Sequence, residues 1–239
     1  MTERTSLAGL TCLVTGASRG IGRAAVVALA DRGARVWAVA RSANALQELE
    51  RECGATPVVV DLSDDTAVWT ALDEVAESAG GVPDVVVNAA GVFGVEACAD
   101  ESVKSFDAHF AINLRAPFLV TRSVLPGMLE RGSGLIVHIG SVAGRKAFPG
   151  NAAYSASKFG LRGFHEVLLE ELRGTGVRAS LIEPAATDTS LWDELDPDSD
   201  PNLPDRADMM TPEQVADTIV FVVTRPDGVS VPHVAVERG

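Results

Sequence analysis

The stretch Thr15-Gly16-Ala17-Ser18-Arg19-Gly20-Ile21-Gly22 decides the fold of this chain. It follows an apolar run, residues 10–15, that predicts a strand, and it leads into small apolar residues at helical spacing. Glycines permit a sharp turn and a close approach of the main chain to a bound group, while free N–H groups at a helix start favour negative charge. The order of strand, glycine turn and helix therefore predicts a phosphate-binding unit.

The rest of the chain repeats this alternation of strand and helix. Runs that are apolar on successive residues predict strands buried on both faces, at residues 10–15, 35–40, 56–60, 84–88, 134–139, 177–182 and 231–236. Helices are predicted after Gly20, over residues 64–79, 103–129 and 151–173, and from Pro212 onward. We therefore expect one α/β domain over residues 1–239, a doubly wound parallel sheet of the Rossmann type with about seven strands and helices on both faces.

Composition and charge exclude several classes of protein. A net charge of −13 argues against nucleic acid and anionic membranes as partners. The three cysteines and four histidines show neither disulfide-framework nor metal-ligand spacing, so no metal site is predicted. No apolar run approaches the ~18 residues of a membrane span, and the start of the chain does not read as a cleavable signal. We expect a cytoplasmic protein.

Tyr154 and Lys158 are the residues best suited to acid–base chemistry. They are four apart on a predicted helix, so their side chains share one face. A free tyrosine, with a pKa of about 10, is a poor general base at neutral pH, and a nearby ammonium group lowers that pKa by favouring the phenolate. Tyr154 is the only tyrosine of the chain, so we expect it to exchange the proton with a substrate oxygen.

Taken in order, these motifs resemble those of the short-chain dehydrogenases/reductases. The glycine turn reads T-G-x-x-x-G-x-G, residues 88–91 are similar to the family's N-A-G element, and Tyr154 to Lys158 matches Y-x-x-x-K. The resemblance covers nearly the whole chain and implies hydride transfer between a nicotinamide cofactor and a small ketone, aldehyde or secondary alcohol. It also implies that Ser141 orients the substrate oxygen, that Asn113 holds a water relaying protons to Lys158, and that Lys158 binds the nicotinamide ribose.

The same resemblance implies a cofactor site at the carboxyl ends of the strands. Its expected residues are Gly16, Ser18, Arg19, Gly20, Ile21, Gly22, Arg41, Asp61, Leu62, Asn88, Ala89, Gly91, Tyr154, Lys158, Pro184, Thr187 and Thr189. An NAD enzyme usually carries Asp or Glu about 20 residues beyond the glycines to hold the ribose 2′-hydroxyl. Here Arg41 follows the second strand, and Arg19 lies within the turn. Because arginine binds phosphate through paired N–H donors, NADP(H) is favoured.

Residues 185–210 break the alternation, with eight acidic residues against the single base Arg206. A long irregular segment after the sixth strand predicts a substrate lid. We expect the substrate between this lid, Ser141, Val142, residues 147–151 and Tyr154, and the acids of the lid favour neutral or weakly polar ketones. Candidates for an apolar wall are Phe93, Phe148, Leu191 and Trp192.

Several alternatives stay open at this point. The C-terminal sequence resembles the branch with 3-hydroxy acid (serine-type) dehydrogenases and carbonyl reductases, so an NAD-dependent alcohol or 3-hydroxy acid dehydrogenase is one alternative. A non-catalytic cofactor-binding sensor or scaffold is another, although it would not need an acid–base pair. Ala185 stands where the family commonly has glycine, which puts the local backbone in question. The family also implies a homo-oligomer, a dimer or tetramer.

Overall fold

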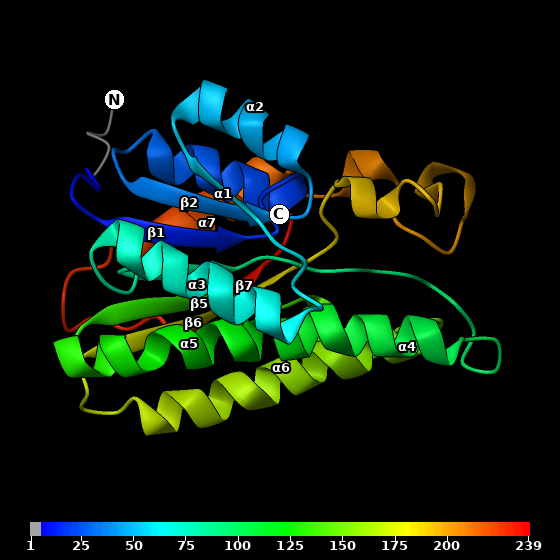
Figure 1. The fold of residues 1–239 in the computed structure, drawn as a ribbon. Coiled ribbons are helices and arrows are strands. Elements are labelled where there is room, and N and C mark those ends of the chain that lie inside the picture. The colour runs from blue at the N-terminus through cyan, green and yellow to red at the C-terminus, as the bar shows by residue number, and fades with distance from the viewer. Residues whose placement is uncertain (1–5) are drawn as a thin grey trace.

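A computed structural model describes residues 6–239 and contains one sheet of seven parallel strands in the order β3-β2-β1-β4-β5-β6-β7 (Figure 1). The strands are β1 Thr11–Thr15, β2 Arg35–Ala40, β3 Thr56–Val59, β4 Val85–Asn88, β5 Gly134–Ile139, β6 Val177–Pro184 and β7 His233–Val236. The order reverses between β1 and β4, and ligands of such sheets bind outside the carboxyl ends of the strands at this point. The predicted doubly wound, Rossmann-type domain is confirmed.

Helices cover both faces of the sheet. The main ones are α1 Gly20–Ala30, α2 Ala43–Cys53, α3 Asp65–Ala79, α4 Val103–Phe110, α5 Ala116–Arg131, α6 Ala152–Glu171 and α7 Pro212–Val223. Successive strand residues point to opposite faces, so Val14 packs in the core beneath α1, α2 and α7, while Leu13 packs in the core beneath α3, α5 and α6. This two-sided burial explains the continuous apolar runs of the strands.

The helix α2 is absent from the sequence prediction. Only Leu46 and Leu49 of this charged segment are buried, so its apolar stripe is short. Its ends are nevertheless well marked: the Ser42 hydroxyl accepts a hydrogen bond from the Ala45 amide, and Gly54 ends the helix in the left-handed conformation.

The helix predicted over residues 103–129 consists of three parts. A π-helix, η1 Ala111–Arg115, joins α4 to α5 and contains Asn113. A π segment widens the helix locally and changes the direction of its side chains, and such segments are frequent at functional sites. Apolar periodicity cannot reveal it, because the flanking turns keep the ordinary α repeat.

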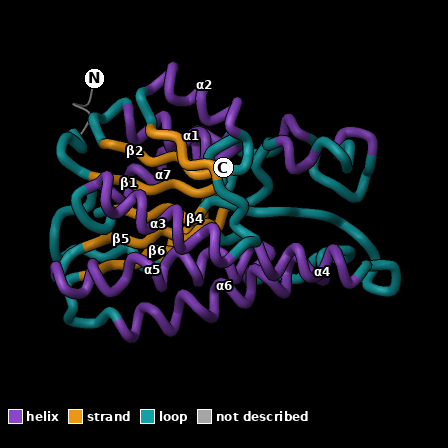
Figure 2. The backbone as a smooth tube through the Cα atoms, viewed as in Figure 1, coloured by secondary structure: helices purple, strands orange, loops and turns teal. Residues whose placement is uncertain are grey.

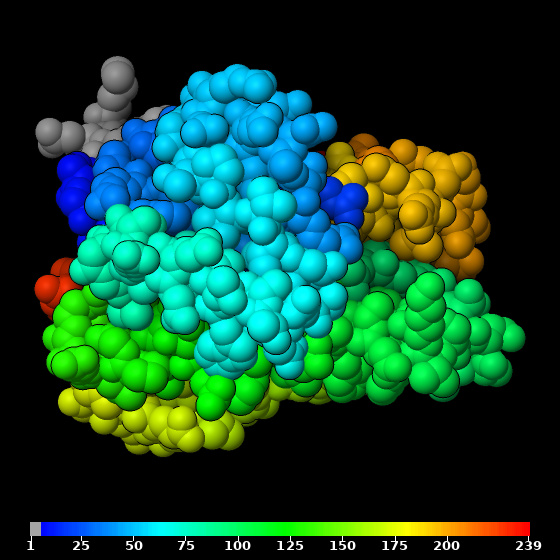
Figure 3. Space-filling model, viewed as in Figure 1, coloured from blue at the N-terminus to red at the C-terminus, as the bar shows by residue number. Residues whose placement is uncertain are grey.

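The segment 185–210 forms a lobe beyond the carboxyl ends of the strands (Figures 1 and 2). It contains three short 3₁₀ helices, η3 Ser190–Trp192, η4 Pro197–Ser199 and η5 Arg206–Asp208. In the space-filling view the lobe, yellow to orange, lies beside the blue N-terminal part of the chain and the green region of α4 (Figure 3). Within residues 6–239, no helix has the length and apolar character of a membrane span.

Candidate active site

A cavity of about 1200 Å³ opens at the carboxyl ends of the strands. All but two of the expected catalytic and cofactor-binding residues line this cavity. They are Gly16, Ser18, Arg19, Gly20, Ile21, Gly22, Arg41, Asp61, Leu62, Ala89, Gly91, Ser141, Tyr154, Lys158, Pro184, Thr187 and Thr189. The two exceptions, Asn88 and Asn113, are buried and do not line the cavity. The volume exceeds the ~300–1,000 Å³ of a typical small-ligand pocket, so it suits a dinucleotide together with a small substrate.

The glycine turn after β1 packs main chain against main chain. A Cβ atom on Gly16 would lie 2.6 Å from Ala90 Cα, and one on Gly22 would lie 2.3 Å from the Gly16 carbonyl oxygen. The Thr15 hydroxyl accepts hydrogen bonds from the amides of Ala89 and Ala90, at 3.1 and 3.2 Å, and so ties β1 to the end of β4. No side chain caps the start of α1, which leaves its first N–H groups available to an anion. This cradle fits a pyrophosphate.

One end of the cavity carries two arginines and one carboxylate, Arg19, Arg41 and Asp61. Arg19 and Arg41 are both exposed to the cavity. Asp61 Oδ1 accepts hydrogen bonds from the amide and hydroxyl of Ser63, at 2.9 and 2.8 Å. These bonds, and then the charge of Arg41, lower the pKa of the Asp61 carboxyl. A fixed carboxylate and two guanidinium groups match the base and the phosphorylated ribose of an adenine nucleotide.

The acid–base residues meet at the middle of the cavity. Tyr154 and Lys158 lie on α6, and Ser141 follows β5. Lys158 is 5% exposed, its Nζ donates to the Ile139 carbonyl at 2.9 Å, and it lies 5.8 Å from the centre of the Tyr154 ring. The Ser141 hydroxyl accepts from the Ala143 amide at 3.1 Å. The structure therefore brings together three of the four expected catalytic side chains on one wall.

Burial governs the protonation of this group. It raises the pKa of Tyr154 above its ordinary value, although hydrogen bonding with Ser141 works in the opposite direction, and it lowers the pKa of Lys158 to about 8. The sequence predicts that Lys158 lowers the pKa of Tyr154, whereas in the structure desolvation of the phenol is the largest influence and raises that pKa. The favoured form is thus the neutral phenol, which is the form that donates a proton to a carbonyl oxygen.

Asn113 has no free side-chain group in this structure. Its Oδ1 accepts from the Val92 amide at 2.8 Å, and its Nδ2 donates to the Val92 carbonyl and to the Ser157 hydroxyl, both at 3.0 Å. Asn113 therefore ties the loop after β4 to α6 beside Lys158, and its expected water-holding role stays a prediction. Asn88 is also buried, and neither amide atom has a hydrogen-bond partner among residues 6–239.

Aromatic rings form the wall at the lobe end. The Phe93 ring centre lies 4.8 Å from that of Tyr154 and 4.7 Å from that of Trp192, and Trp192 Nε1 donates to the Thr187 carbonyl at 3.1 Å. All four expected apolar residues lie on the wall, namely Phe93, Phe148, Leu191 and Trp192. Ala185 adopts an ordinary backbone, because Asp196 is the sole non-glycine residue with a positive φ within 6–239.

Glu237 and Arg238 also line the cavity, although no sequence motif predicts them as site residues. They follow β7, which pairs with β6 and so delivers the end of the chain to the site. Arg238 contacts the Ala207 carbonyl and the Asp208 carboxylate of the lobe. Only the pairing of two strands distant in sequence places them here, so no local motif could have predicted them.

A family model of short chain dehydrogenases matches residues 10–200. The chain belongs to the short-chain dehydrogenase family. It is therefore an oxidoreductase of the type that acts on alcohol and carbonyl groups, as the order of motifs predicts.

Individual relatives span several substrates. The chain is 36% identical over 227 residues to D-threitol dehydrogenase of Mycolicibacterium smegmatis, with 91% of this chain and 87% of that protein covered. It is 35% identical over 228 residues to carbonyl reductase [NADPH] 2 of Sus scrofa, with 92% and 91% covered. It is also 34% identical over 240 residues to glycine betaine reductase ATRR of Emericella nidulans; the match covers 97% of this chain but only 19% of that longer protein.

Solved structures of the family share the fold. The closed form of a serine dehydrogenase in complex with NADP+ has a TM-score of 0.87 at 30% identity, with 95% of this chain and 94% of the other covered. A metagenomic short-chain oxidoreductase in complex with NADP has a TM-score of 0.82 at 34% identity, with 98% of both chains covered.

Proposed function

We propose that the protein is an NADP(H)-dependent reductase of small, neutral ketones or aldehydes, which also oxidises the corresponding secondary alcohols. The observation that carries the cofactor choice is the pair Arg19 and Arg41 on the cavity wall, where the residue after β2 is a cation instead of the acid that holds a 2′-hydroxyl. The neutral Tyr154 beside Ser141 supports the reductive direction. Two similar proteins, the serine dehydrogenase and the metagenomic oxidoreductase, are described with NADP bound.

The residues of this chain divide the work of such a reaction. A bound nicotinamide supplies or takes up the hydride. The start of α1 and the glycine turn hold the pyrophosphate, and Arg19 and Arg41 hold the 2′-phosphate. Ser141 orients the substrate oxygen, and Tyr154 donates its proton to that oxygen during reduction or removes it during oxidation. Lys158, fixed by the Ile139 carbonyl, holds the ribose and restores the proton of Tyr154.

The charges around the substrate end favour a neutral substrate. The cations on the wall within residues 6–239 are Arg19, Arg41, Lys158 and Arg238. The first two lie at the adenosine end, and Arg238 contacts Asp208. Lys158 already donates to the Ile139 carbonyl, and Arg145 and Lys146 do not line the wall. A substrate carboxylate would instead meet acids such as Asp200. A 3-hydroxy acid is therefore disfavoured.

The segment 185–210 acts as the lid of this site in our proposal. Its start and end are joined by the bridge between Thr187 and Met210. Arg206 forms ion pairs with Asp188 at 2.6 Å and with Asp193 at 2.7 Å. The only basic residue of the segment therefore offsets part of the negative charge of the segment itself. Trp192 places an aromatic ring over the substrate end. A lid of this kind excludes water from the hydride transfer.

Turnover with a panel of substrates tests the function. We expect the purified protein to oxidise NADPH in the presence of neutral ketones or aldehydes, with a kcat/KM at least about tenfold above that for 3-oxo acids of similar size. Tyr154→Phe, assayed beside it, should show no comparable turnover. Activity with NADH alone contradicts the cofactor proposal, and a preference for 3-oxo acids contradicts the substrate proposal.

We also propose a homo-oligomer that uses the outer faces of α4, α5 and α6. These helices expose large apolar side chains, among them Val103, Phe118, Phe159 and Val167. A second copy of the chain would remove them from water. Light scattering on the purified protein should give a dimer or tetramer, and a monomer at micromolar concentration would contradict the proposal. The cytoplasmic location stays a prediction.

A further inference from the structure

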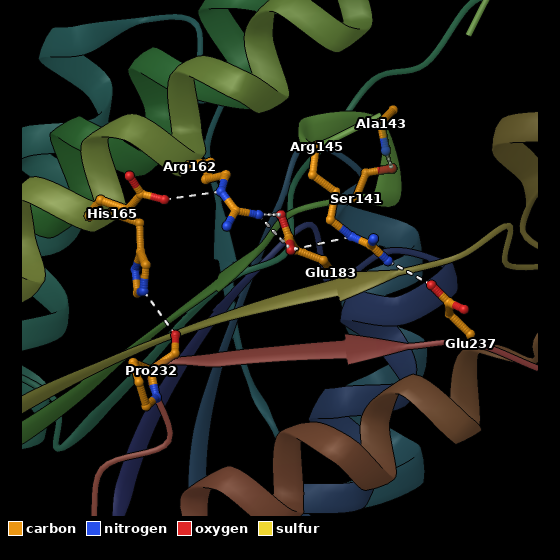
Figure 4. A network of polar contacts seen from close by, with 9 residues as sticks. Ser141, Ala143, Arg145, Arg162, His165, Glu183, Pro232 and Glu237 are labelled. Atoms are coloured by element: carbon orange, nitrogen blue, oxygen red, sulfur yellow. Dashed lines mark hydrogen bonds and ion pairs between the residues drawn. The ribbon is translucent and has the colours of Figure 1, made fainter. Parts of the chain in front are cut away.

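Ion pairs link four charged side chains near Ser141, namely Arg145, Arg162, Glu183 and Glu237, and a fifth, Glu166, joins them at Arg162 (Figure 4). Arg162 Nη1 lies 3.0 Å from both carboxylate oxygens of Glu183. Arg145 Nε lies 3.8 Å from Glu183 Oε2, and its Nη2 donates to Glu237 Oε1 at 2.6 Å. Glu183 is the centre of the network and its most buried member, since its side chain is 5% exposed against 32% for Arg162 and 61% for Glu237.

Each member comes from a segment that carries part of the site. Arg162 lies on α6, one turn after Lys158. Arg145 directly follows the short helix η2, Val142–Gly144, whose N-cap is Ser141. Glu183 precedes Pro184, and Glu237 itself lies on the wall. The network therefore joins α6, the Ser141 loop, the end of β6 and the end of the chain.

The packing of the Ser141 loop, residues 140–146, leads to the same carboxylate. A Cβ atom on Gly140 would lie 3.2 Å from Glu183 Cγ, and one on Gly144 would lie 3.1 Å from the Lys158 carbonyl oxygen. The Gly140 amide also donates to the Ile182 carbonyl at 2.7 Å. The loop thus fits between the Glu183 stem on one side and the main chain of α6 on the other.

A buried carboxylate costs free energy unless it is paired, and a buried ion pair adds little net stability because desolvation offsets the attraction. What such a pair does provide is a fixed geometry, since both oxygens of Glu183 and the planar guanidinium group restrict the relative positions of their elements. We propose that Glu183 is a positioning residue, which through Arg145 and Arg162 holds the Ser141 loop against α6 at the separation that proton transfer by Tyr154 requires.

The catalytic part of this proposal rests on the proposed function, but the structural part does not. Hydrogen exchange of the amides in the Ser141 loop measures how often the loop opens away from α6, and it needs no substrate. Three of these amides, those of Gly144, Arg145 and Lys146, donate to carbonyls within the loop. In Glu183→Gln we expect them to exchange about tenfold faster or more, because the loop opens more often when the charged joint is lost.

The kinetic part compares kcat with cofactor binding. Because displacement by ~1 Å can cost up to ~100-fold in rate, Glu183→Gln should lower kcat by about tenfold or more. Its Kd for NADPH should stay within about twofold of wild type, since the glycine turn and both arginines are untouched. A loss of general stability would weaken cofactor binding and turnover together, so the split identifies a positioning role.

Glu166→Gln is the matched control. Glu166 Oε1 accepts from Arg162 Nε at 3.0 Å on the exposed side of α6, so the variant also removes one carboxylate from this arginine but leaves Glu183 in place. Its loop exchange and kcat should stay within about twofold of wild type, as expected for an exposed pair. Equal exchange in Glu183→Gln and Glu166→Gln overturns the proposal.

Two further outcomes are separable. If the wild-type protein fails to reduce ketones but Glu183→Gln speeds amide exchange in the loop, the proposed function is wrong and the positioning of the loop by Glu183 is still supported. If Glu183→Gln does not fold, Arg145→Gln, which changes a side chain that is 36% exposed, breaks the same joint at the loop. Unchanged exchange of the Gly144 and Lys146 amides in Arg145→Gln also overturns the proposal.

Discussion

The two ends of the cavity are built in different ways. The cofactor end is built largely from the first 41 residues, namely the main chain of the glycine turn with Arg19 and Arg41, to which Asp61 adds a carboxylate. The substrate end brings together Phe93, Trp192 and the last residues of the chain, which meet only after the sheet has formed. Binding a constant group needs a fixed main-chain cradle, whereas selecting a substrate depends on side chains carried by loops. Tyr154 lies between the ends and serves both.

The largest expected effect concerns the residue that the two ends share. Tyr154→Phe keeps the ring beside Phe93 but removes the proton donor, so kcat should fall by at least ~100-fold, the usual scale of acid–base catalysis. The Kd for NADPH should change by less than about threefold if the two ends are independent. Turnover close to wild type would show that another group transfers the proton.

The next effect concerns the cofactor end alone. Arg41→Ala should weaken NADPH binding by about tenfold, the loss expected for a hydrogen bond between charged groups in a solvent-exposed site, and should leave NADH binding nearly unchanged. Arg19→Ala should do the same. Arg23→Gln is the control, because Arg23 pairs with Glu52 on the same surface and does not line the cavity. Equal loss of NADPH and NADH affinity would contradict a 2′-phosphate contact.

A smaller effect is expected at the substrate end. Trp192→Ala removes the ring that faces Phe93 and should raise KM for a neutral ketone by several-fold up to about tenfold, which corresponds to ~1–1.5 kcal/mol of aromatic contact. The Kd for NADPH should remain that of wild type. Trp192→Phe keeps an aromatic ring and should recover most of the loss. A shift in cofactor affinity equal to that in KM would show that the two ends are coupled.

The smallest effect is a change in protonation. Because hydrogen bonding with Ser141 lowers the pKa of Tyr154 against the larger effect of burial, Ser141→Ala should raise that pKa further. The chain contains a single tyrosine, so absorbance of the phenolate during an alkaline titration reports on Tyr154 alone. The folded protein should ionise at higher pH than the unfolded chain. If the tyrosine of the folded protein and that of the unfolded chain ionised at the same pH, the desolvation of the Tyr154 phenol would be contradicted.

The sequence predicts the cofactor end better than the substrate end for a physical reason. The glycine turn and the Tyr154–Lys158 pair are local patterns, in which spacing alone fixes geometry. The helix α2 has too few buried residues to show a stripe, and the π segment around Asn113 interrupts a pattern that otherwise stays helical. Glu237 reaches the wall only through the pairing of β7 with β6.

The charges show the same limit. Arg145 lies four residues after Ser141 in the sequence, and this closeness alone would make it a candidate counter-ion for the substrate. The structure instead pairs it with Glu183 and Glu237, residues 38 and 92 positions further along the chain. Whether a charge is free or paired depends on such distant contacts, so composition alone could not separate a substrate-binding arginine from a structural one.

Titration of the wild-type protein with NADPH and with NADH, followed by cofactor fluorescence, tests the central claim most directly. The account predicts that NADPH binds at least about tenfold more tightly, because Arg19 and Arg41 contact a 2′-phosphate that NADH lacks. Equal affinities, or tighter binding of NADH, would contradict the assignment of these two arginines and with it the NADP(H)-dependent function.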